Sequence, residues 1–294
     1  MASEYTVLRG VEGAIKPSSV PKPQLRPRDI LIKISHFGGV GIVEAIGSDV
    51  TQFKVCECAG GGYHRDSCGH CSYCLSGQDI WCYERKAYLH KVPEGLASEH
   101  AAPLQCAGAS TDNALIQVVK PGDRIGIIGT GGLSHLAIQF AQKLGTEVVV
   151  FSTSRSKEEE AGKLGASEFY LLDELKKLEK PVNTLVVAGS KYPVWEKFMQ
   201  KKVLARAGNV IPLAAPHGAL NLRSFQMFFA RYNIRSSLVA YRGRHDEMLQ
   251  FAVTHIVKPW VETFELSEAG IADVVEKLNA NKIRCRGVLV AKDA

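Results

Sequence analysis

Residues 129–134 read Gly-Thr-Gly-Gly-Leu-Ser, a glycine-rich turn. The apolar run 125–128 before it is typical of a short buried strand, and apolar residues recur at helical spacing over 133–144. Strand, glycine turn and helix in this order favour a dinucleotide site. The glycines let the backbone approach a diphosphate, and the helix N-terminus offers N–H donors. The alternative is an ordinary strand–helix turn without a ligand. The predicted cofactor contacts are Gly129, Gly131, Gly132 and Leu133.

Strand-like and helical patterns alternate from residue 121 onward. The predicted strands are 125–128, 148–151, 185–188, 210–213 and 234–239. The predicted helices between them are 133–144, 157–164 and 194–204. This alternation predicts an α/β fold with a parallel, doubly wound sheet, whose first strand leads into the glycine turn.

The end of the second predicted strand indicates which dinucleotide binds. A carboxylate there would bind the ribose 2′-hydroxyl of NAD, and the sequence has none at this place. Hydroxyls and cations stand there instead, and they suit the 2′-phosphate of NADP(H). The alternative is a solvated loop. The predicted 2′-phosphate contacts are Ser152, Thr153, Ser154, Arg155 and Lys157.

Four cysteines follow the spacing C-x2-C-x2-C-x7-C. They are Cys68, Cys71, Cys74 and Cys82. Four thiolates on short loops predict a closed, tetrahedral structural zinc site. An iron–sulfur cluster is one alternative, but its fourth cysteine comes sooner and is followed by proline. Disulfides are the other, and we favour them least because no export signal is evident.

Composition limits the remaining classes. The 294 residues are 46% hydrophobic and 22% charged, which allows two globular domains. The net charge of +6 comes from scattered lysines and arginines, which argues against a nucleic-acid partner. No apolar run reaches the roughly 18 residues of a membrane span, so we expect a cytoplasmic protein without a membrane partner.

Several stretches together resemble the zinc-containing medium-chain alcohol dehydrogenases, especially their NADP-dependent, cinnamyl-alcohol-dehydrogenase-like branch. The matching stretches are 29–36, 66–74, 101–108, 129–134 and 281–288. The resemblance implies a shortened GroES-like β domain formed by residues 1–107 and 244–294. It also implies a Rossmann dinucleotide-binding domain over residues 108–243.

The resemblance further implies a function and site residues. The activity would be hydride transfer between NADPH and a small-molecule aldehyde or alcohol, or an activated alkene, in a homodimer. The cysteine quartet would bind the structural zinc, and Arg286 would contact the cofactor phosphates. Cys106 would be the last ligand of a catalytic zinc, although residue chemistry alone favours a core cysteine there.

The chain also departs from the family pattern. Ser35-His36 runs directly into Phe37-Gly38-Gly39, so the first catalytic cysteine, the proton-relay hydroxyl and a His-Glu pair are missing. The candidates for rebuilding a catalytic site beside Cys106 are Cys56, Cys58, His36 and His64. Two hypotheses remain open: an active NADP(H)-dependent oxidoreductase, or an inactive NADP-binding homologue that retains only the structural zinc. A truncated, poorly folding chain is a third reading.

Overall fold

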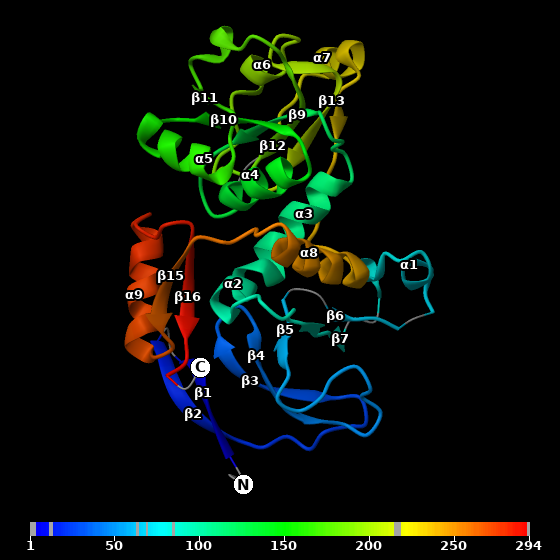
Figure 1. Cartoon of the computed structure of the whole chain (residues 1–294), viewed down its shortest axis with the longest axis vertical. Coiled ribbons are helices and arrows are strands. Elements are labelled where there is room, and N and C mark those ends of the chain that lie inside the picture. Colours follow the sequence, from blue (N-terminus) through cyan, green and yellow to red (C-terminus); the bar gives the residue numbers. More distant parts are fainter. Residues whose placement is uncertain are drawn as a thin grey trace. The chain divides into compact units, whose positions relative to one another are not determined.

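Figure 1 shows the computed structural model of the chain, coloured along its sequence. The structure describes residues 4–11, 14–62, 65–68, 70–83, 86–214 and 219–292. They form two compact units. The first combines Met1–Cys106 with Trp260–Ala294, and the second is Ala107–Pro259. Among the described helices, none is long and apolar enough to cross a membrane.

The second unit contains a six-stranded, wholly parallel sheet of order β11-β10-β9-β12-β13-β14. The chain starts at the central strand β9, moves outward to one edge, then returns and moves to the other, so the predicted doubly wound sheet is confirmed. Its strands are β9 (Arg124–Ile128), β10 (Glu147–Ser152), β11 (Glu168–Leu171), β12 (Val182–Val187), β13 (Leu204–Pro212) and β14 (Asn233–Ile234). Its helices are α3 (Ala109–Ile116), α4 (Ser134–Lys143), α5 (Glu158–Leu164), α6 (Trp195–Phe198), α7 (Ser224–Ala230) and α8 (Arg242–Thr254).

Helices cover both faces of this sheet, with α4 and α5 on one side and α6 on the other (Figure 1). Every residue of β9 is buried, as expected for a central parallel strand covered on both faces. Phe151 of β10 packs edge-on against Phe198 of α6, with 5.4 Å between the ring centroids. Leu136 and Phe140 of α4 are fully buried as well. The continuous apolar runs in the sequence therefore reflect two-sided burial.

Two predicted elements differ from those observed. The helix predicted over 194–204 is only the single turn α6, because Leu204 already belongs to strand β13. Phe198, Met199 and Val203 are nevertheless buried in the same core, so their apolar spacing is satisfied without a continuous helix. The strand predicted over 234–239 shortens to β14, whose two residues form the edge of the sheet.

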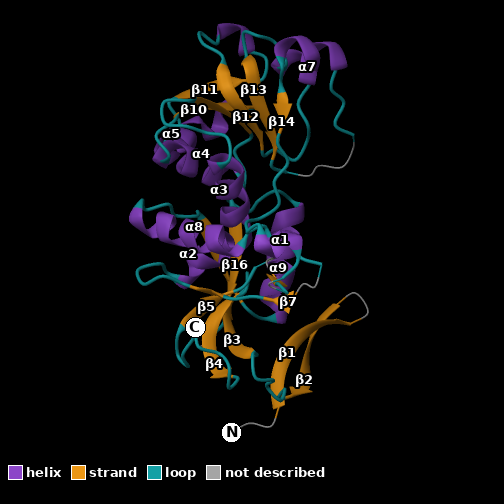
Figure 2. Cartoon of the chain, turned by 90° about the vertical axis from the view of Figure 1, so that its right-hand side faces the viewer, coloured by secondary structure: helices purple, strands orange, loops and turns teal. Residues whose placement is uncertain are grey.

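The first unit is built on a six-stranded mixed sheet of order β15-β16-β3-β4-β5-β8 (Figure 2). Its strands are β3 (Ile30–His36), β4 (Val40–Ile46), β5 (Cys58–Gly60), β8 (His90–Lys91), β15 (Val261–Glu265) and β16 (Arg286–Val290). Two short ladders accompany the sheet: β1 (Glu4–Val11) with β2 (Ala14–Pro21), and β6 (Arg65–Asp66) with β7 (Lys86–Ala87). Its helices are α1 (Ser72–Leu75), α2 (Ser98–Pro103) and α9 (Glu268–Asn279).

The C-terminal segment completes this sheet. Val290 of β16 pairs with His36 of β3, so the two ends of the chain share one β structure. Helix α9 begins after its N-cap residue Ser267, whose Oγ accepts a hydrogen bond from the Gly270 N–H at 3.1 Å.

The sequence predicted that the chain returns to the β domain at residue 244, and the structure places this return later. Helix α8 instead packs on α3 within the second unit. Arg244 of α8 donates from Nε and Nη2 to the two carboxylate oxygens of Asp112 on α3, at 2.6 Å each. The Asp112 side chain is fully buried, so this two-pronged ion pair ties α8 to α3. The return to the first unit therefore begins at Trp260.

We expect Arg244→Ala to lower the free energy of unfolding by about 3–5 kcal/mol, because it leaves the Asp112 carboxylate buried without its cation. Lys163→Ala is the control, since it breaks an exposed pair with Glu159 and should cost at most about 1 kcal/mol. Urea unfolding of both variants and the parent chain measures the difference. Equal losses in the two variants would contradict this account.

The same substitution should make stability more dependent on pH. Burial raises the pKa of Asp112, and the Arg244 guanidinium opposes that rise. Without Arg244 the folded state binds a proton that the unfolded state releases, so stability falls as the pH rises. The loss caused by Arg244→Ala should therefore be larger at pH 8 than at pH 5, which unfolding curves at both pH values would test.

Candidate functional site

The glycine turn follows β9 directly and has the backbone geometry that its sequence predicts. Gly129 has φ +105°, in the left-handed region that favours glycine. A Cβ at Gly129 would lie 3.1 Å from Ser134 Oγ and 3.2 Å from the Gly189 Cα, so a side chain would also be crowded. At Gly131, by contrast, a Cβ would meet no atom within 4 Å, so the backbone there faces open space.

Helix α4 begins at this turn. The N-cap residue Leu133 makes no side-chain hydrogen bond, so its side chain does not satisfy the N–H groups of the first turn. Ser134, the first helical residue, is fully buried, and its Oγ has no hydrogen-bond partner among the described residues. The Gly129 N–H donates to the Phe151 carbonyl oxygen at 2.8 Å, which ties the turn to the end of β10. The residues present therefore fit the diphosphate of a dinucleotide.

The residues predicted to contact a 2′-phosphate lie together at the end of β10. Ser152 is buried, whereas Thr153, Ser154 and Arg155 are exposed and Lys157 is half-buried. The Ser154 and Ser156 hydroxyls are 2.9 Å apart. Exposed hydroxyls and cations at this strand end can bind an anionic group.

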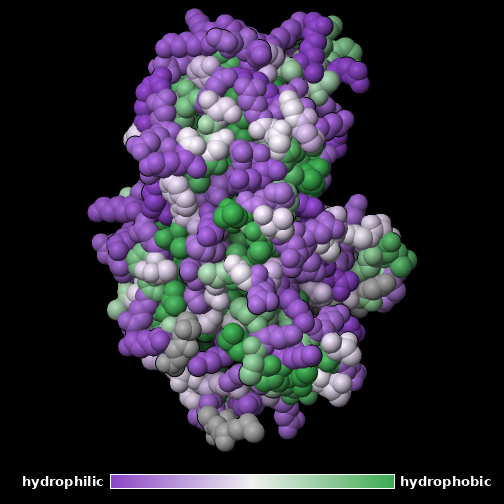
Figure 3. Space-filling view, viewed as in Figure 1, coloured by the Kyte–Doolittle hydropathy of each residue, from purple (hydrophilic) through white to green (hydrophobic). Residues whose placement is uncertain are grey.

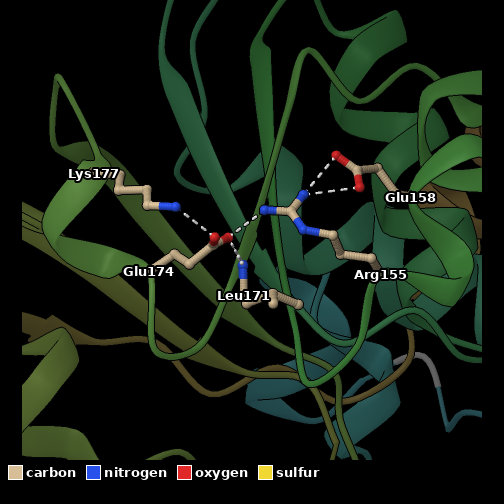
Figure 4. Close-up of polar contacts among 5 residues, drawn as sticks. All are labelled: Arg155, Glu158, Leu171, Glu174 and Lys177. Carbon is tan, nitrogen blue, oxygen red and sulfur yellow. Dashed lines mark hydrogen bonds and ion pairs between the residues drawn. The ribbon is translucent and has the colours of Figure 1, made fainter.

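Two carboxylates hold the Arg155 guanidinium (Figure 4). Arg155 Nη1 donates to both carboxylate oxygens of Glu158, at 3.0 and 2.9 Å. Its Nη2 donates to Glu174 Oε2 at 2.6 Å. Hydrogen bonds from Lys177 and the Leu171 N–H, together with Arg155, lower the pKa of Glu174 to about 2.

Sequence reasoning missed both carboxylates. Glu158 stands three residues after Arg155, so helical spacing offered a signal for it. Glu174 is separated from Arg155 by strand β11, and only the sheet brings the two together.

The cysteine quartet forms a compact cluster in the first unit. The four sulfur atoms all lie within 4.8 Å of one another. Backbone N–H groups already point at two of them: Cys68 donates to Cys82 Sγ at 3.2 Å and Cys71 to Cys68 Sγ at 3.3 Å. Hydrogen bonds from the Cys74 backbone N–H and from the neighbouring thiols lower the pKa of Cys71 to about 6. Four thiols at this spacing, with the pKa of Cys71 lowered, fit a tetrahedral zinc ion.

Cys106 lies elsewhere in the first unit. It is exposed in a π-helical turn, Leu104–Gly108, between α2 and α3. Within the described ranges, the quartet is the only group of three or more potential ligands, so Cys106 does not gather with Cys56, Cys58 or His36. His64 lies outside the described residues. The described residues therefore do not fit a catalytic zinc at Cys106.

His36 and Arg286 accompany Cys106 in the first unit. The His36 ring is buried with its Nδ1 2.9 Å from Ser35 Oγ, and this burial lowers its pKa, an effect that the Glu99 carboxylate partly offsets. Burial also lowers the pKa of Arg286 at the start of β16, and charge interactions with Cys106 and Cys285 partly offset that effect.

Comparison with known proteins places this geometry in context. No protein-family model matches the chain. An alcohol dehydrogenase of Geobacillus stearothermophilus is 33% identical over 276 residues, covering 85% of this chain and 81% of that protein. NADP-dependent alcohol dehydrogenase C 1 of Mycolicibacterium smegmatis (strain ATCC 700084 / mc(2)155) is 27% identical over 278 residues, covering 85% and 79%. A solved cinnamyl alcohol dehydrogenase from Sorghum bicolor matches with a TM-score of 0.86 at 24% identity, covering 98% and 96%.

The structural match confirms the fold, a GroES-like β domain with a Rossmann domain. The sequence match at 33% identity extends over most of both proteins, although this chain is the shorter one. The glycine turn and the cysteine cluster have the geometry that such enzymes need for a dinucleotide and a structural metal. This chain belongs to the zinc-containing medium-chain alcohol dehydrogenases.

Proposed function

We propose that the protein is an NADP(H)-dependent oxidoreductase that interconverts an aldehyde and an alcohol, or reduces an activated alkene. The end of β10 carries this proposal, because it presents hydroxyls and cations and no carboxylate at the strand end itself. The relatives are named as dehydrogenases, and one of them as NADP-dependent. They give no support to the alternative of an inactive homologue.

The cofactor supplies the hydride chemistry, and the chain binds and orients it. The turn at Gly129 and Gly131 lets the backbone approach the diphosphate, and the N–H groups at the start of α4 donate to it. At the far end of β10, the Thr153 and Ser154 hydroxyls and the Lys157 ammonium group suit the 2′-phosphate. In the described part of the chain no carboxylate pairs with Lys157, so its charge is available to an anion. Arg286 remains a proposed contact of the cofactor phosphates.

We also propose a single structural zinc held by Cys68, Cys71, Cys74 and Cys82. Helix α1 and the short turn Asp79–Trp81 bring these thiols together, and a bound ion would close the loop between β6 and β7. Its role is stability, because four protein ligands leave no position for substrate. Cys106 remains the candidate contact for substrate.

Lys157→Ala should weaken binding of NADPH about tenfold and leave NADH nearly unchanged, because a charge-assisted hydrogen bond to the 2′-phosphate is lost. Lys163→Ala is the matched control, since it removes an equal charge from helix α5, where Lys163 pairs with Glu159. Fluorescence titration of each cofactor measures both constants. Tighter binding of NADH than of NADPH by the parent protein would refute the proposed cofactor.

Elemental analysis of the purified protein should find a single zinc per chain. Cys82→Ser should lose this zinc and lower the melting temperature, because Cys82 is the buried member of the quartet. Cys56→Ser is the control and should keep the metal, since Cys56 is exposed and outside the quartet. A second zinc that disappears in Cys106→Ser would instead establish a catalytic metal site.

We further propose a homodimer formed through helix α7. Phe225, Phe228 and Phe229 are 71%, 77% and 64% exposed, and their rings contact one another within this helix. In Figure 3, hydrophobic side chains are visible over α7 at the upper right, as they are at several other places on this face. Among the described strands, β14 lies at the edge of the sheet and pairs with β13 alone. An exposed apolar group next to an open strand edge suits a second copy of the same surface.

Phe228→Asp combined with Phe229→Asp should convert the dimer into a monomer, because two charges would have to be buried at the contact. Light scattering coupled to size-exclusion chromatography gives the molar mass of each form. Leu75→Asp is the control, because Leu75 is similarly exposed on α1 of the first unit. A parent protein that is monomeric at micromolar concentration would contradict the proposed assembly.

A further inference from the structure

The strongest unassigned feature is the ion-pair cluster around Arg155 in the second unit (Figure 4). Arg155 lies in the loop after β10, Glu158 opens helix α5, and Glu174 lies in the turn after β11. Three consecutive parts of the βαβ unit therefore meet at one guanidinium. This place is the strand end at which a Rossmann fold binds the adenosine ribose.

Glu174 is fixed independently of Arg155. Its carboxylate accepts the Leu171 N–H at 3.1 Å and the Lys177 Nζ at 2.7 Å. Leu171 pairs with Ser152, the last residue of β10, so this carboxylate is in register with the cofactor strand. The Glu174 side chain is only 15% exposed, whereas Arg155 is 48% exposed. The Glu174 carboxylate is thus held by partners other than Arg155, and it can fix the position of the more exposed guanidinium.

The charges around Arg155 do not cancel its attraction for an anion. The positive charge of Lys177 balances Glu174, and that of Arg155 balances Glu158. The positive charge of Lys157 has no balancing carboxylate in this group. The five groups therefore carry a net charge of +1. The Arg155 guanidinium also keeps donors in reserve, because the two carboxylates engage Nη1 and Nη2 and no described acceptor engages Nε.

We propose that Glu174 is a positioning residue for cofactor selection, holding the Arg155 guanidinium where it donates to the 2′-phosphate of NADP(H). The inference rests on the proposed cofactor. A long side chain that is already ordered loses less conformational entropy on binding than a free one. The Glu174 carboxylate is ionised at neutral pH, because its three donors lower its pKa to about 2. NAD(H) lacks the 2′-phosphate and therefore gains nothing from this arrangement.

The test compares Glu174→Ala, Arg155→Ala and the double variant in the full chain. Fluorescence titration gives the dissociation constants of NADPH and NADH without any need for turnover. Each single variant should weaken NADPH binding about fivefold and change NADH binding less than twofold. The double variant should be no weaker than Arg155→Ala alone, because Glu174 acts only through that guanidinium.

Two further variants make the result specific. Glu174→Gln keeps an oxygen acceptor for the Leu171 N–H and for Arg155 but loses the charge, so its NADPH constant should lie between those of the parent and Glu174→Ala. Glu159→Ala is the charge control, since Glu159 is exposed on the same helix as Glu158 and pairs only with Lys163 among the described side chains. It should leave both constants unchanged.

The outcomes separate this inference from the cofactor proposal. If the parent chain prefers NADPH and Glu174→Ala binds it as well or better, the inference is wrong and the cofactor proposal stands. Equal weakening of NADPH and NADH would identify a merely structural residue and would also overturn the inference. A parent chain without preference for NADPH overturns both, and the titration of the unmodified protein shows this before any variant is made.

Discussion

Parallel pairing of β9 with β10 and β12 is the constraint on which the second unit depends. Because all these strands point the same way, their carboxyl ends lie together along one side of the sheet. The glycine turn, the hydroxyl-rich end of β10 and the Glu174 turn all lie at these carboxyl ends. At the amino ends of the strands, Arg124 of β9 binds the carboxylates of Glu147 and Glu168, which joins three neighbouring strands. Contacts at the carboxyl and amino ends of the strands thus hold the sheet register, and the residues of the site are positioned by it.

Two other ion-pair systems of this unit differ in their physical role. Asp112 and Arg244 are buried, and their pairing offsets a desolvation cost that either group alone would impose. Arg155 and its carboxylates are partly exposed, and such pairs contribute little to stability. Their value lies in orientation, which fits their position beside the strand that carries the predicted cofactor contacts. Burial therefore distinguishes a pair that stabilises the fold from one that we propose orients a cofactor contact.

The first unit has the fold of its relatives, but it differs from the family pattern in the residues expected around Cys106. Its sheet joins the two ends of the chain, and its cysteine quartet is arranged as a metal site requires. By the resemblance, the family's catalytic-zinc residues have no counterpart after Ser35-His36, and the described residues do not gather a replacement set at Cys106. Arg286, at the start of β16, belongs to the same unit as the exposed Cys106. The resemblance thus places the missing residues in the first unit, whereas the glycine turn lies in the second.

Much of this structure could be predicted from the sequence, because the deciding features are local. The glycine turn, the buried strands around it, the N-cap at Ser267 and the cysteine spacing all depend on neighbouring residues, whose conformations and ligand geometry follow from residue type. Other features required the folded chain. Residues 194–204 have apolar spacing typical of a helix, yet tertiary burial satisfies it with one turn and a strand. Helix α8 is tied to the second unit by contacts distant in sequence, such as Arg244 with Asp112, 132 residues earlier, and Phe251 with Phe140. Glu174 meets Arg155 for the same reason, since sheet pairing brings together carboxylates and cations whose separation along the chain carries no signal of contact.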